Sequence, residues 1–164
     1  MRSLGYLTRL GTVAVAVALS LVLVAPTSAH PSDSRHHSRV LWAHMNGAQE
    51  VPVPGDPDGK GGAKITLLPR YGTICFRLRV KDITLPADAA HIHAGAWGVA
   101  GPVVVALGAP DAEGKAKGCT TGVDPELIKD IGRHPRMYYV NVHTSDFPDG
   151  AVRGQLHWNN GHKH

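Results

Sequence analysis

Short stretches in which apolar and polar residues alternate, separated by glycine and proline, dominate the chain from residue 40 onward. In the clearest stretch, 73–80, every second residue is apolar: Ile74, Phe76, Leu78 and Val80. Because successive side chains of a strand point to opposite faces, this pattern predicts a half-buried strand of an antiparallel sheet. Shorter patterns of the same kind predict strands over 40–45, 63–68, 90–94, 103–107, 137–144 and 151–158. The predicted fold class is all-β, an antiparallel β-sandwich of about seven or more short strands.

One segment favours a helix, because Asp124 suits an N-cap, Pro125 suits the first helical position and Gly132 suits a stop. The sandwich is therefore expected to carry one short helix. Segments 55–62 and 108–121 are rich in glycine and polar residues, and they predict loops.

The first 29 residues have the features of a secretory signal peptide. Arg2 and Arg9 precede an apolar run, and the small residues expected at a cleavage site lie between Pro26 and Ala29. The apolar run, about 16 residues, is short for a membrane span of roughly 20. A retained anchor is the alternative. Cleavage after Ala29 predicts a secreted, extracytoplasmic protein without a stable membrane span.

The mature chain divides into three parts. Residues 30–39 are rich in histidine and serine and predict a flexible lead-in, 40–158 form one domain, and 159–164 predict a disordered tail. The leader carries two of the 17 basic residues and none of the 13 acidic ones, so the mature charge is nearly balanced. No stripe of Lys and Arg interleaved with aromatic residues occurs along the sequence. We therefore expect no nucleic-acid partner, and a cell-surface or extracellular protein is the partner class left open.

Cys75 and Cys119 form an even set in a chain predicted to leave the cytoplasm, which favours a disulfide. In the chain-entropy model, closing a loop of this length stabilises the fold by roughly 4 kcal/mol. Cys75 has the parity opposite to the apolar set of its strand, so the bond would anchor the loop around Cys119 to the sheet. The alternative, a pair of thiolate metal ligands, lacks further ligands at a suitable spacing nearby.

Three histidines are candidate metal ligands. His91 and His93 are two residues apart in the predicted strand 90–94 and so share a face, opposite the apolar residues Ala90 and Ile92. His143 lies in the strand 137–144 at the parity of its polar residues. If the two strands are neighbours, three imidazoles converge, a ligand set suited to copper or another transition metal. The alternative is three histidines that face solvent or make ordinary hydrogen bonds.

Five motifs in order resemble those of the CHRD domain, a module named for its repeats in chordin and also found as single-domain secreted bacterial proteins. They are Asn46 to Pro52, Ala90 to Gly95, Gly101 to Val105, Tyr139 to Thr144 and Gly150 to Leu156. The resemblance extends from about Val40 to Trp158. It implies an all-β, extracytoplasmic module whose biochemical role is poorly defined.

A weaker similarity concerns the copper site of copper/zinc superoxide dismutases. Those enzymes place a His-x-His pair on one strand, a further copper ligand on a late strand and an anion-steering arginine near the end of the chain. His91, His93, His143 and Arg153 are similar to that set, although the bridging histidine and the zinc-loop ligands have no counterpart here. Arg153 has the alternative of a structural pairing with Asp146, Asp149 or Glu50.

Two functional hypotheses follow. The first is a secreted CHRD module that acts in binding or structure without catalysis, since no nucleophile-and-base signature occurs. The second is a protein that binds copper, or another transition metal, through His91, His93 and His143. An enzyme is the less expected outcome, and copper is the cofactor that the second hypothesis implies.

Overall fold

The computed structural model describes residues 39–158, which form nine strands, one α-helix and three short 3-10 turns. The strands and the helix are β1 (Arg39–Asn46), β2 (Lys60–Leu68), β3 (Thr73–Lys81), β4 (Ala89–Ala94), β5 (Val103–Leu107), β6 (Lys115–Thr120), α1 (Pro125–Arg133), β7 (Tyr138–His143), β8 (Val152–Gln155) and β9 (His157–Trp158). Apart from Arg39, the predicted leader, lead-in and tail lie outside the described residues.

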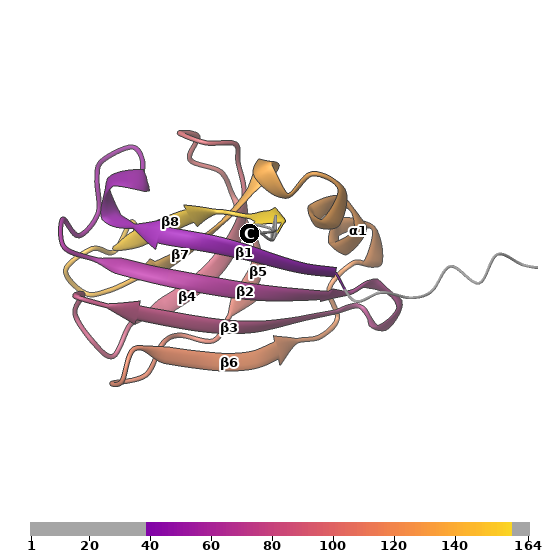
Figure 1. Cartoon of the computed structure of the whole chain (residues 1–164), viewed down its shortest axis with the longest axis horizontal. Coiled ribbons are helices and arrows are strands. Elements are labelled where there is room, and N and C mark those ends of the chain that lie inside the picture. Colours follow the sequence, from indigo (N-terminus) through magenta and orange to yellow (C-terminus); the bar gives the residue numbers. More distant parts are fainter. Residues whose placement is uncertain (1–38, 159–164) are drawn as a thin grey trace, which may run out of the picture. The chain divides into compact units, whose positions relative to one another are not determined.

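All strands belong to one antiparallel sheet with the order β5-β4-β7-β8-β1-β2-β3-β6, and β9 pairs with β1. In Figure 1, β1, β2, β3 and β6 lie in front, whereas β4, β5 and β7 pass behind them. The edge strands β5 and β6 meet where the Thr120 hydroxyl donates to the carbonyl of Ala106 at 2.6 Å. The predicted all-β antiparallel fold is confirmed, and its two layers are parts of one nearly closed sheet.

The core lies between the two layers and consists of the apolar residues at alternate positions of each strand. The four apolar residues of β3 are buried as predicted. The same core contains five other side chains that are fully buried: Leu41, Ile65, Ile92, Val140 and Val142. Complete burial of such a side chain contributes about 1.5–3 kcal/mol. The opposite parity forms the outer face of the sheet, which carries most of the polar side chains of the strands.

The predicted helix is present and covers one end of the core with Ile128 and Ile131. The Asp124 carboxylate accepts a hydrogen bond from the amide of Glu126 at 2.9 Å, which caps the helix as expected. The helix ends at Arg133, one residue beyond the predicted stop. No helix within residues 39–158 has the length and apolar character that a membrane crossing requires.

Three predicted boundaries were wrong. The segment 108–121 contains strand β6, whose side chains are mostly exposed because it is an edge strand with little apolar alternation. The predicted loop 55–62 ends early because β2 begins at Lys60. The predicted last strand is interrupted at Leu156, whose amide donates to the carbonyl of Tyr138; β8 pairs with β7 and β1, and β9 pairs with β1.

The disulfide between Cys75 and Cys119 is confirmed. Its two residues are direct partners in the register of β3 and β6, on the outer face of the sheet. The bond therefore joins an edge strand to its neighbour, and the expectation that it anchors a loop is corrected.

Candidate metal centre

The register of three neighbouring strands gathers polar side chains on the outer face. Across β4 and β7, His91 lies opposite Asn141 and His93 lies opposite Tyr139. Across β7 and β8, Asn141 lies opposite Arg153. The sequence produces this face because the alternate residues of the same strands are apolar and fill the core, so the polar residues must point outward. The strands that carry the three histidines are therefore direct neighbours in the sheet, which is the condition for their convergence.

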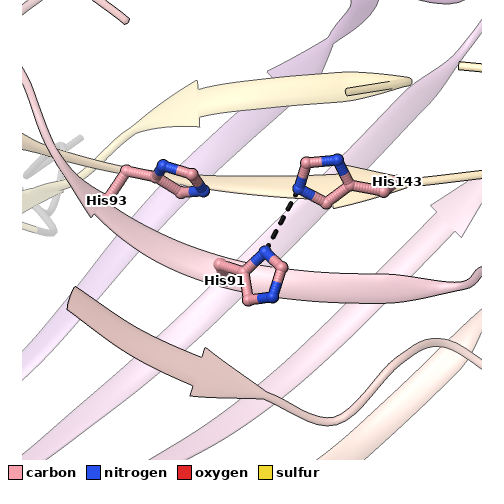
Figure 2. A group of neighbouring side chains, drawn as sticks. All are labelled: His91, His93 and His143. Carbon is pink, nitrogen blue, oxygen red and sulfur yellow. Dashed lines mark hydrogen bonds between the residues drawn. The ribbon is translucent and has the colours of Figure 1, made fainter. Parts of the chain in front are cut away.

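His91, His93 and His143 come together on this face (Figure 2). The Nδ1 atom of His91 lies 3.2 Å from Nε2 of His143, and one nitrogen from each of the three rings lies within 4.8 Å of the others. Two nitrogen ligands about 2.0–2.1 Å from one ion are about 2.9 Å apart at a right angle and about 4.1 Å apart when opposite. The 3.2 Å separation of the His91 and His143 nitrogens falls within this range, and the 4.8 Å limit of the whole group lies about 0.7 Å above it.

Backbone carbonyls fix the orientation of two of the rings. His93 Nδ1 donates to the carbonyl of Gly101 and His143 Nδ1 to that of Pro148, each at 2.8 Å. Since a carbonyl can only accept, each Nδ1 carries the proton and each neutral ring presents a lone pair at Nε2. The Nε2 atom of His93 is buried without a hydrogen-bond partner among the described residues. This is the arrangement that outer-shell carbonyls give to histidine ligands of metals.

The surroundings favour neutral imidazoles. Burial lowers the pKa of His91, and the neighbouring rings of His143 and His93 lower it further. Burial also lowers the pKa of His93, whose ring is 8 % exposed, although its hydrogen bond to Gly101 acts in the opposite direction. Neutral rings are the form that binds metal ions.

A buried polar cluster lies beside the histidines. The guanidinium of Arg153, 1 % exposed, lies 3.4 Å from the ring centre of Tyr139, and the imidazole of His93 stacks on the same ring at 4.8 Å. Glu50 is also buried, and this burial raises the pKa of its carboxyl to about 7 although the positive charge of Arg153 opposes the shift. Oε1 of Glu50, Oδ1 of Asn141 and Nη1 of Arg153 have no hydrogen-bond partner within residues 39–158.

The loop 95–102 covers this cluster and is held by its side chains. Arg153 donates to the carbonyl of Ala96 at 2.9 Å, and the Gln155 amide donates to that of Gly95 at 2.6 Å. The hydroxyl of Tyr139 accepts from the amide of Gly101, the residue whose carbonyl orients His93. The loop and the histidine ligand set are therefore parts of one hydrogen-bonded unit.

The predicted site residues are placed as follows. The three histidines converge, whereas Arg153 is buried beneath the loop and has no carboxylate within ion-pair distance among the described residues. From the sequence, Glu50 was expected only as one possible partner of Arg153, and its place in a buried cluster was not predicted. The one sequence signal for it is its position inside the motif Asn46 to Pro52.

These features define an all-β domain of one nearly closed antiparallel sheet with a histidine cluster on its outer face. The family model for the CHRD domain matches residues 41–156, and the chain belongs to the CHRD domain family. No curated protein and no solved structure was found to match it.

Proposed function

We propose that this CHRD domain binds one transition-metal ion through His91, His93 and His143, and that copper is the ion bound most tightly. The observation that carries the proposal is the convergence of the three rings: one nitrogen of each lies within 4.8 Å of the others, and backbone carbonyls orient His93 and His143 through Nδ1. An ion at the centre of the three rings would take these nitrogens as ligands. Among divalent first-row metals, Cu²⁺ generally has the highest affinity for nitrogen ligands.

Binding requires one rearrangement of protons. Nε2 of His143 already has a lone pair, so the 3.2 Å contact places the proton on Nδ1 of His91. Moving that proton to Nε2 of His91 frees Nδ1, and the hydrogen bond between the two rings is then replaced by two bonds to the ion. His91 and His143 are only partly buried, which leaves the ion a side open to solvent. The proposal concerns binding and assigns no reaction.

We also propose that the protein acts outside the cytoplasm. The disulfide between Cys75 and Cys119 supports this, because such bonds persist mainly in oxidising compartments. The predicted signal peptide agrees with it. Sequencing the amino terminus of protein recovered from the culture medium should give His30 as the first residue. Recovery of the uncleaved chain in the membrane fraction would favour the retained anchor instead.

The metal proposal is tested by counting bound ions after expression of the full-length chain. The wild type should retain one copper ion per chain after passage over a weak chelator, with an electron paramagnetic resonance spectrum showing nitrogen ligands. The variant His93→Ala should lose that ion. The matched control is His134→Ala. This variant removes an exposed histidine at the C-terminal end of α1 that belongs to no group of potential metal ligands among the described residues. Equal copper retention in the wild type and in His93→Ala would refute the proposal.

Histidines outside the described residues can bind copper without a fixed geometry, and a second control removes the two of the carboxyl-terminal tail. The variant His162→Ala/His164→Ala should keep the tightly bound ion and its spectrum. If this variant loses the ion while His93→Ala keeps it, the copper belongs to the tail.

A further inference from the structure

A strongly basic surface covers the outer face of β2, β3 and β6, the three strands that lie side by side at the front of Figure 1. We call it the basic face, and its seven cationic residues are Lys60, Lys64, Arg77, Arg79, Lys81, Lys115 and Lys117. The three strands contain no acidic residue. Among residues 39–158, only Lys81 of this set pairs with a carboxylate, that of Asp82 at 3.5 Å.

The register of the strands arranges these cations in rows. Lys64, Arg77 and Lys117 lie directly opposite one another across the three strands. Arg79 and Lys115 form the next row. With neighbouring strands about 4.8 Å apart and alternate residues about 7 Å apart, the rows form a grid that extends about 10 Å across the strands.

This arrangement lowers the stability of the fold. Like charges directly opposite each other on one face of a sheet are destabilising. The basic face contains four such pairs, namely Lys60 with Lys81, Lys64 with Arg77, Arg77 with Lys117 and Arg79 with Lys115. Lysines on an edge strand protect it from unwanted pairing, which accounts for the two lysines of β6. It does not account for the cations of β2 and β3, which are interior strands.

The acidic side chains that border the basic face, Asp82, Asp111 and Glu113, offset its seven positive charges only in part, and within residues 39–158 only Asp82 forms an ion pair with it. Asp111 lies in the loop before β6, where its carboxylate accepts hydrogen bonds from the backbone amides of Glu113 and Lys115. The disulfide between Cys75 and Cys119 lies in the row next to that of Arg77 and holds β6 against β3. The grid is thus kept in register and stays open to an anionic partner.

We propose that the basic face binds a linear anionic polysaccharide. A regular grid of cations matches a polymer that carries regularly spaced charges along its chain. Binding of single-stranded nucleic acid needs several aromatic side chains on which successive bases stack. Phe76 of these strands is buried, and Trp42, opposite Lys64 on β1, is half-buried with its ring 5.5 Å from the Lys64 ammonium, so a single partly covered ring borders the grid. None of the large apolar side chains exposed within residues 39–158 belongs to these strands, so the basic face has no such side chain to insert into a lipid bilayer. The sequence did not reveal this face because two of its cations, Lys115 and Lys117, belong to β6, a segment predicted as a loop.

The proposal is tested with dextran sulfate as the probe and calorimetry as the readout, on protein purified after expression of the full-length chain. Binding should weaken steeply as salt is raised. The triple variant Lys64→Gln/Arg77→Gln/Lys117→Gln should lose about tenfold or more in affinity and show a smaller salt slope. The matched control is Lys129→Gln/Arg133→Gln/Arg136→Gln, which removes the same charge from the region of α1 and should retain the wild-type affinity.

Equal losses in the two triple variants would show that only net charge matters and would overturn the proposal. Tighter binding to polyuridylate or to phosphatidylglycerol vesicles than to dextran sulfate would also overturn it. If the triple variant fails to fold, judged by its circular dichroism, the double variant Arg79→Gln/Lys115→Gln replaces it. That variant removes the neighbouring row and should lose several-fold in affinity.

Discussion

The buried carboxyl of Glu50 makes a specific prediction about how stability depends on pH. Burial raises its pKa from 4.5 to about 7, so between these two values the folded protein holds a proton that the unfolded chain releases. Stability contributed by this group therefore decreases as pH rises from about 4.5 to 7 and is constant above that range. Using 1.36 kcal/mol for each pKa unit, the loss between pH 5 and pH 8 is about 2 to 3 kcal/mol.

The histidines act in the opposite direction and must be separated from Glu50. Because the pKa values of His91 and His93 are lowered, the unfolded chain takes up protons more readily than the folded protein as pH falls below 6.5. Their contribution to stability is therefore lost on acidification. The comparison of wild type with Glu50→Gln at each pH cancels this contribution, because both proteins contain the same histidines.

The assay is urea unfolding followed by circular dichroism at pH 5, 6.5 and 8, with copper excluded by a chelator. Relative to the wild type, Glu50→Gln should gain about 2 to 3 kcal/mol between pH 5 and pH 8, because glutamine has no proton to lose. A difference between the two proteins that is constant across this range, or that changes with the opposite sign, would refute the reasoning.

Two further predictions concern the backbone that supports the two surfaces. Replacing both Cys75 and Cys119 by serine should lower the free energy of unfolding in urea by about 4 kcal/mol, because the unfolded chain is no longer cross-linked. An unchanged urea midpoint would contradict this. Gly101→Ala should lower the melting temperature and weaken copper binding, since its Cβ would collide with the carbonyl of Ala94. Gly98→Ala, at a positive φ with open space around it, should cost only about 1–2 kcal/mol and leave copper binding unchanged.

The parts of the fold that the sequence predicts are those in which local pattern and tertiary position agree. Strand β3 alternates fully because one face is buried and the other is exposed, and α1 has a cap, a first-turn proline and two buried isoleucines. Strand β6 was missed because an edge strand has little apolar side chain to bury, so its pattern does not differ from that of a loop. Its position is determined by pairing with β3 and by the disulfide, neither of which is a local property.

The candidate site also combines features that a local sequence pattern predicts with features that depend on distant segments. The alternation of side chains along a strand is enough to place His91 and His93 on one face. His143 occupies one of the polar positions of β7, which lie on the same face of the sheet. The orientation of the rings depends on carbonyls of Gly101 and Pro148, which belong to loops whose course a pattern of apolar residues does not describe. The burial of Glu50 depends likewise on distant segments.

Both proposed surfaces lie where the sequence departs from what stability alone requires. The inner face of the sheet carries the apolar core. On the outer face, one region buries an arginine and a glutamate without an ion pair, and the other places four pairs of like charges directly opposite each other. Each arrangement has an energetic cost that a neutral polar residue would avoid. Binding of a polyanion would offset the like-charge repulsion of the basic face. The buried charge of Arg153 is not offset by a cation at the histidines; it is held instead by the ring of Tyr139 and the carbonyl of Ala96.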